Sequence, residues 1–162
     1  MKKFILAMAA LTFSFGVMSA QDLASATATY NSGAEALTMG NKTSALEYFQ
    51  KALTMAESLG EEGAEVATNC KNAIPSVILS IGKEFYNNKD FSNAKAKFVE
   101  AAEVAKKYGN EEVTAEVESL LPTVGKRIAL AKVNEAAHLF LEALYVVVDS
   151  LCCHHLAHIC TS

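Results

Sequence analysis

Positions 82–109 of the chain read GKEFYNNKDFSNAKAKFVEAAEVAKKYG, and positions 33–60 read GAEALTMGNKTSALEYFQKALTMAESLG. The two stretches share six small or aromatic positions, each separated from its counterpart by 49 residues. The first set is Gly33, Ala45, Phe49, Ala52, Ala56 and Gly60, and the second is Gly82, Ala94, Phe98, Ala101, Ala105 and Gly109. Self-similarity at a fixed period of roughly 20–50 residues is typical of repeat proteins. The pattern therefore predicts an all-α fold built from helical hairpins. Such hairpins stack and present an extended surface.

Each repeat unit is expected to hold two helices joined by a short polar turn. The expected helices are Tyr30–Met39 and Thr43–Leu59 in the first unit, and Ile74–Tyr86 and Phe91–Tyr108 in the second. Asp90 is well placed to cap the last of these helices. Gly60 and Gly109 suit the left-handed backbone that ends a helix.

Two proline signatures precede the second unit and an incomplete third one. They read Ile-Pro-Ser-Val at 74–77 and Leu-Pro-Thr-Val at 121–124. We interpret each as lying within one long helix that includes the preceding segment, although a break into two helices fits equally well.

The third unit keeps the Ala-Phe-Ala steps at Ala136, Phe140 and Ala143 but lacks the turn. Either its first helix is short and Asn134 begins the second, or one helix runs through.

The order Gly33-Ala45-Phe49-Ala52, repeated as Gly82-Ala94-Phe98-Ala101, resembles the tetratricopeptide repeat. The period of 49 exceeds the usual 34 of that family, so the chain looks like the long-helix variety of exported bacterial repeat proteins. The resemblance implies an α-solenoid of antiparallel helical hairpins, with about two full repeats plus an incomplete third. It also implies a concave groove that binds peptides or other proteins.

The N-terminus has the layout of a secretory signal peptide. Lys2 and Lys3 precede an apolar run from Phe4 to Val17, and the small residues Ser19 and Ala20 follow. This charged, apolar and small-residue order predicts export, with cleavage near Ala20. We therefore expect a periplasmic or secreted bacterial protein with no stable membrane span after cleavage. An uncleaved anchor and a plain buried helix are the alternatives.

Composition excludes several classes of function. The formal net charge is −4, Arg127 is the single arginine, and basic residues form no block, so nucleic acid is not an expected partner. The eight glycines are dispersed and form no phosphate loop. Acidic clusters such as Glu61, Glu62 and Glu65 suit helix starts better than acid–base catalysis. We expect no enzymatic activity and no cofactor.

The expected organisation is a signal peptide at 1–20, a repeat domain at 21–149 and an atypical tail at 150–162. The repeat units are expected at about 22–60, 61–109 and 110–149. The tail holds Cys152, Cys153 and Cys160 with His154, His155 and His158. Thiolates and imidazoles are ligands of zinc and copper, but the spacing matches no common zinc pattern, so no metal site is expected. Metal binding by the tail remains an alternative.

The first functional hypothesis is an exported, non-enzymatic scaffold that mediates protein–protein interaction and binds a protein or peptide partner. The expected groove residues are Asn31, Glu35, Lys83, Tyr86, Asn87 and Arg127. The alternative is a truncated or frame-shifted fragment of a longer repeat array, with a structural or self-associating role.

Overall fold

A computed structural model describes the backbone of residues 2–160 and the side chains of residues 20–148. These residues form five helices and no strand. The helices are α1 (Lys2–Thr38), α2 (Lys42–Ser58), α3 (Ala64–Asn87), α4 (Phe91–Tyr108) and α5 (Glu111–Cys160). The chain divides into two units, Met1–Leu121 and Pro122–Ser162. The prediction of an all-α fold is confirmed.

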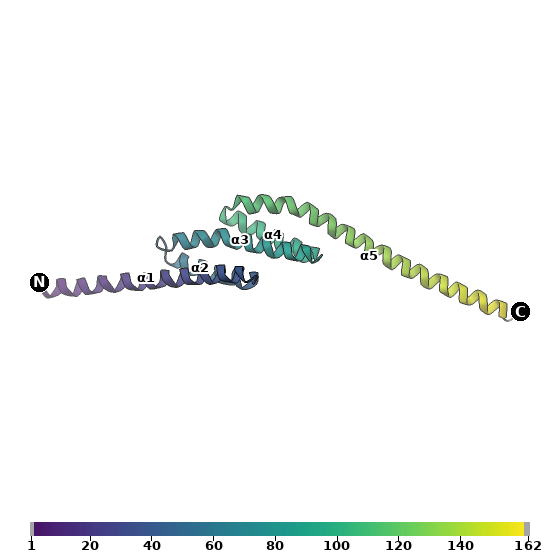
Figure 1. The fold of residues 1–162 in the computed structure, drawn as a ribbon, viewed down its shortest axis with the longest axis horizontal. Helices are drawn as coiled ribbons and strands as arrows, with labels where there is room; N and C mark the ends of the chain where they lie inside the picture. Colours follow the sequence, from purple (N-terminus) through teal and green to yellow (C-terminus); the bar gives the residue numbers. More distant parts are fainter. Residues whose placement is uncertain (1, 161–162) are drawn as a thin grey trace. The chain divides into compact units, whose positions relative to one another are not determined.

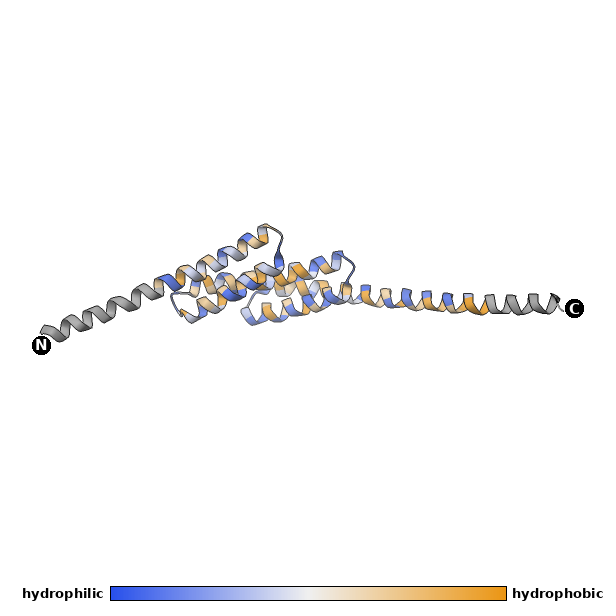
Figure 2. Cartoon of the chain, turned by 90° about the horizontal axis from the view of Figure 1, so that it is seen from below, coloured by the Kyte–Doolittle hydropathy of each residue, from blue (hydrophilic) through white to orange (hydrophobic). Residues whose placement is uncertain are grey.

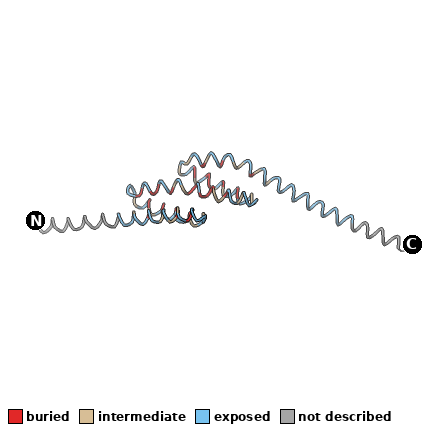
Figure 3. The backbone as a smooth tube through the Cα atoms, in the orientation of Figure 1, coloured by how far each residue is buried: buried red, intermediate tan, exposed pale blue. Residues whose placement is uncertain are grey.

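Within the first unit, helices that follow one another in the chain pack against each other. α1 packs on α2, α2 on α3 and α3 on α4, and these four helices lie side by side (Figure 1). Short turns join α1 to α2 and α3 to α4, so each of these pairs is an antiparallel hairpin. Buried residues line the contacts between neighbouring helices (Figure 3).

The two hairpin turns are built from the same hydrogen bonds at equivalent positions of the two repeats. The Asn41 backbone N–H donates to the Ala36 carbonyl at 2.8 Å, and the Asp90 N–H donates to the Phe85 carbonyl at 2.9 Å. The side chains of Asn41 and Asp90 then cap the next helix, each accepting a bond of 3.1 Å from a backbone N–H. The predicted cap at Asp90 is confirmed. The sequence period is therefore also a structural period.

Gly40 and Lys89 occupy the same position in these two turns, and both have positive φ angles, of 79° and 63°. The left-handed conformation suits glycine but costs a residue with a Cβ about 1–2 kcal/mol. Lys89 therefore carries strain that Gly40 avoids.

We expect Lys89→Gly to raise the free energy of unfolding by about 1 kcal/mol, because relief of strain exceeds the extra chain entropy of glycine. Lys89→Ala is the matched control, since alanine keeps the Cβ and should leave stability within about 0.5 kcal/mol. Urea unfolding followed by circular dichroism measures both. Equal effects of the two variants would contradict the strain argument.

Each hairpin is closed by a glycine beneath a phenylalanine ring. A Cβ placed on Gly33 would lie 2.7 Å from the Phe49 ring, and one on Gly82 would lie 2.6 Å from the Phe98 ring. Phe49 and Phe98 are only 2% and 1% exposed. The absence of a side chain at the glycine thus lets the ring pack against the backbone of the facing helix.

The rest of the buried face of α2 and α4 is made mainly of alanines. The predicted inward alanines are all buried, namely Ala45, Ala52, Ala56, Ala94, Ala101 and Ala105. Cys70 on α3 is also buried, and desolvation raises the pKa of its thiol from 9.0 to about 11. This thiol therefore stays protonated at neutral pH.

Helix ends agree with the sequence patterns, whereas the start of one helix lies much earlier than expected. α4 spans the predicted Phe91–Tyr108, and Gly109 follows it with the predicted positive φ of 73°. α3 begins at Ala64 and includes the segment before Ile74, so the interpretation of one long helix is confirmed. α1 begins at Lys2 instead of Tyr30, because no proline or turn sequence separates the two.

Both prolines lie inside long helices, so the alternative of a break at either one is wrong. α3 continues through Pro75, and α5 continues through Pro122. α5 also runs through Asn134, so a second helix does not begin there. The physical reason is local, because residues 129–135 read ALAKVNE and contain neither glycine nor a turn motif.

Candidate protein-binding surface

A cleft of about 260 Å³ lies between α1 and the beginning of α3, and we call it the α1–α3 cleft. Its lining residues on α1 are Leu23, Thr27, Tyr30 and Asn31, and those on or just before α3 are Glu62, Glu65, Val66 and Asn69. The cleft belongs entirely to the first unit of the chain.

The apolar part of the cleft is held in place by the first hairpin. The Tyr30 ring packs on the Phe49 ring with centroids 5.2 Å apart, and Phe49 in turn covers Gly33. Val66 is buried and Tyr30 is half-buried. An aromatic side chain fixed by its neighbour costs little conformational entropy when it contacts a partner.

The polar walls carry an amide on each side. Asn31 on α1 and Asn69 on α3 are both exposed, and both line the cleft. A carboxamide offers two donors and an acceptor, which matches the N–H and C=O groups of a peptide backbone. The two asparagines can therefore hold the main chain of an extended segment without regard to its side chains.

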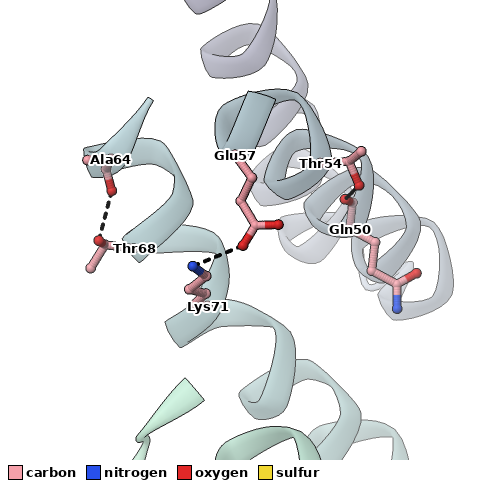
Figure 4. A network of polar contacts seen from close by, with 6 residues as sticks. All are labelled: Gln50, Thr54, Glu57, Ala64, Thr68 and Lys71. Atoms are coloured by element: carbon pink, nitrogen blue, oxygen red, sulfur yellow. Dashed lines mark hydrogen bonds and ion pairs between the residues drawn. The ribbon is translucent and has the colours of Figure 1, made fainter. Parts of the chain in front are cut away.

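The cleft is acidic. Glu62 and Glu65 contribute two carboxylates, and none of the described lining residues is Lys or Arg. The nearest lysine on α3, Lys71, pairs with Glu57 of α2 at 2.9 Å (Figure 4). The carboxylate of Glu65 therefore favours a partner with a positive charge.

Other lysines in the first unit pair across helices. Lys42 at the start of α2 pairs with Glu84 of α3, and Lys106 of α4 pairs with Glu118 of α5 at 3.2 Å. These side chains are largely exposed, so each pair contributes only about 0–1 kcal/mol.

The structure separates the two predicted groove residues of α1. Asn31 lines the α1–α3 cleft, whereas Glu35 lines another hollow of about 360 Å³ with Met39 and Tyr48. Their common helix therefore contributes to two surfaces.

Three more predicted residues lie on the last two turns of α3, outside the cleft. Lys83 pairs with Glu116 of α5 at 2.6 Å, and the Tyr86 ring packs on the Phe91 ring with centroids 5.3 Å apart. Asn87 is exposed at the end of α3. Arg127 is exposed on α5 in the second unit.

Sequence reasoning missed the residues that α3 brings to the cleft, chiefly Glu65, Val66 and Asn69. They lie on the part of α3 that precedes the repeat-like segment from Ile74. The available signal was the acidic cluster beginning at Glu61, which we interpreted as a solvated helix start.

The described side chains contain no group of three His, Cys, Asp or Glu residues that could hold a metal ion. The predicted Cys/His tail, at 150–162, lies outside the residues whose side chains are described. Among the described residues, no helix combines the length and the apolar character needed to cross a bilayer.

Comparison of the chain with protein-family models, with curated proteins and with solved structures finds no match.

Proposed function

We propose that this chain is an exported, non-enzymatic helical-repeat scaffold that binds an extended segment of a partner protein in the α1–α3 cleft. The observation that carries the proposal is the pair of amides, Asn31 of α1 and Asn69 of α3, which line one cleft together with apolar side chains. A periplasmic or secreted location is part of the proposal and follows from the signal-like N-terminus.

The proposed architecture is a short α-solenoid related to the tetratricopeptide repeat. Its support is the recurrence of one hairpin at the sequence period, with the same turn hydrogen bonds and the same contact of glycine with phenylalanine. Stacked hairpins present concave surfaces, which repeat proteins use for binding.

The chemistry of the cleft favours one kind of segment. Glu65 attracts a lysine or arginine, Tyr30 and Val66 accept a neighbouring apolar side chain, and the amides bind the main chain. The partner segment is accordingly an extended peptide with a basic residue next to an apolar one.

The test is a positional-scanning library of extended peptides, titrated against the purified full chain by fluorescence anisotropy. We expect selection of a basic residue beside an apolar one, with affinity falling as salt is raised. Asn31→Ala and Asn69→Ala should each weaken binding about 3- to 10-fold, which is the value of one lost hydrogen bond. Glu65→Gln should weaken binding of basic peptides selectively.

Asn72→Ala is the matched control, because Asn72 is an exposed asparagine one turn beyond Asn69 and lies outside the cleft lining. It should leave affinity unchanged. Binding that depends on Lys83 or Asn87 but not on Asn31 and Asn69 would place the partner on the end of α3 and overturn this assignment.

A further inference from the structure

The second unit of the chain exposes a large amount of apolar surface. Every described residue from 131 to 148 on α5 is exposed (Figure 3). The last described turns of this helix are predominantly apolar (Figure 2). Leu139, Phe140 and Leu141 are 60%, 66% and 64% exposed. A helix with this much apolar surface is normally covered by a partner.

This exposed segment carries the inward face of a hairpin's second helix. Ala136, Phe140 and Ala143 keep the same order and steps as Ala94, Phe98 and Ala101. In α4 those three positions are buried in the hairpin. In α5 the same pattern has no cover among the described residues.

The other half of the same contact also lies on α5, and it too is unoccupied. A Cβ built on Gly125 meets no atom within 4 Å, whereas a Cβ on Gly33 or Gly82 meets a phenylalanine ring. The separation of Gly125 and Phe140 along the chain is only one position shorter than that of Gly82 and Phe98. The third unit thus has both members of the contact of glycine with phenylalanine.

One continuous helix cannot bring these two residues together. The stretch of α-helix from Gly125 to Phe140 spans about 22 Å, and α5 has no turn within it. Because this stretch makes close to four full helical turns, Gly125 and Phe140 lie on nearly the same face. A contact between Gly125 and Phe140 can therefore form only between two molecules of this chain.

We propose that α5 pairs antiparallel with α5 of a second copy of this chain, so that Gly125 of each copy lies beneath Phe140 of the other. A two-fold axis that relates the two copies generates this contact twice, as in domain swapping. Ala129 and Ala136, which share the face with Gly125, let the two helices approach closely.

Charge favours the antiparallel orientation over the parallel one. The half of α5 around Gly125 carries Lys126, Arg127 and Lys132, and the half around Phe140 carries Glu135 and Glu142. Antiparallel pairing places the basic half of one copy beside the acidic half of the other, whereas parallel pairing places like charges together. The proposal is independent of peptide binding, because none of these residues lines the α1–α3 cleft.

The experiment measures the mass of the full chain by light scattering over a concentration series. We expect a dimer that dissociates on dilution. Gly125→Leu should raise the dissociation constant at least about 10-fold, because the added side chain meets Phe140 of the second copy. It cannot harm the monomer in the same way, since the site is open and leucine favours helix more than glycine does.

Two further variants identify the contact. Phe140→Ala should also weaken the dimer, and the double variant Gly125→Leu with Phe140→Ala should recover most of the affinity, because leucine fills the space left by the ring. Leu141→Ala is the matched control, since Leu141 is as exposed as Phe140 but is turned about 100° away on the helix.

Three outcomes would overturn the proposal. They are a monomer at every concentration, a double variant no tighter than either single variant, and association that appears only when anionic lipid vesicles are added. The second would indicate parallel or head-to-tail pairing, and the third a membrane as the cover of this helix.

Discussion

Replacing Phe98 with alanine is expected to lower the free energy of unfolding by about 3–5 kcal/mol. The ring is 1% exposed and fills the space between α3 and α4 directly over Gly82. The other buried residues of α4 are alanines, which cannot extend into the cavity that the ring would leave. Since small domains have a total stability of about 5–15 kcal/mol, this single change removes a large fraction of it. Chemical unfolding followed by circular dichroism is the measurement.

The control for this prediction is Val99→Ala on the same helix. Val99 is exposed, so its truncation should change stability by no more than about 0.5 kcal/mol. If both variants lost the same amount of stability, burial of the Phe98 ring would not explain the effect, because alanine has a higher helix propensity than either residue, and Phe98 would not be the closing contact of the hairpin.

Adding a single methyl group at Gly82 is expected to destabilise the same hairpin from the opposite side. The new Cβ of Gly82→Ala would lie 2.6 Å from the Phe98 ring and 3.2 Å from the Lys97 Cβ. Because the ring is buried on all sides, it can yield only by displacing α3 from α4. We expect a loss of about 1–3 kcal/mol from this overpacking, despite a gain of about 1 kcal/mol in helix propensity.

Gly125→Ala provides the matched control because the same substitution there meets no atom within 4 Å. At low protein concentration it should leave stability unchanged or raise it by up to about 1 kcal/mol. If the free energy of unfolding falls for Gly82→Ala and rises for Gly125→Ala, close contact between helices is the cause. A gain at both positions would mean that α3 and α4 lie further apart than the structure shows.

The sequence allowed the hairpins to be predicted because their determinants are local. The bounds of α4 follow from the Asp90 cap and from Gly109, whose φ is 73°. The inward face of α2 follows from residues at steps of three and four, since Ala45 and Phe49 are both buried as expected. Each of these signals acts within a few positions of the feature that it determines.

The long helices and the cleft were harder to predict because each depends on a choice between conformations of similar free energy. Proline weakens a helix but does not specify whether it ends, and neighbouring helices that bury Pro75 can offset the lost hydrogen bond. The cleft joins Asn31 to Asn69, and no local pattern relates these positions. The part of α3 before Ile74 was expected to be helical, but which of its residues face α1 depends on packing between helices that are distant in the sequence.

In the first unit each helix packs mainly on its neighbours in the sequence, and this order also affects which helix unfolds locally first. α1 makes its main contact with α2, and α2 and α3 each have helices on two sides. α1 can consequently detach without disturbing the contact between α3 and α4, whereas detaching α3 disrupts the whole unit. Local unfolding should therefore begin at α1, and the amide hydrogens of α3 should be the slowest to exchange with solvent. Because α1 forms one wall of the cleft, a bound segment would stabilise the helix that is otherwise the least stable of the unit.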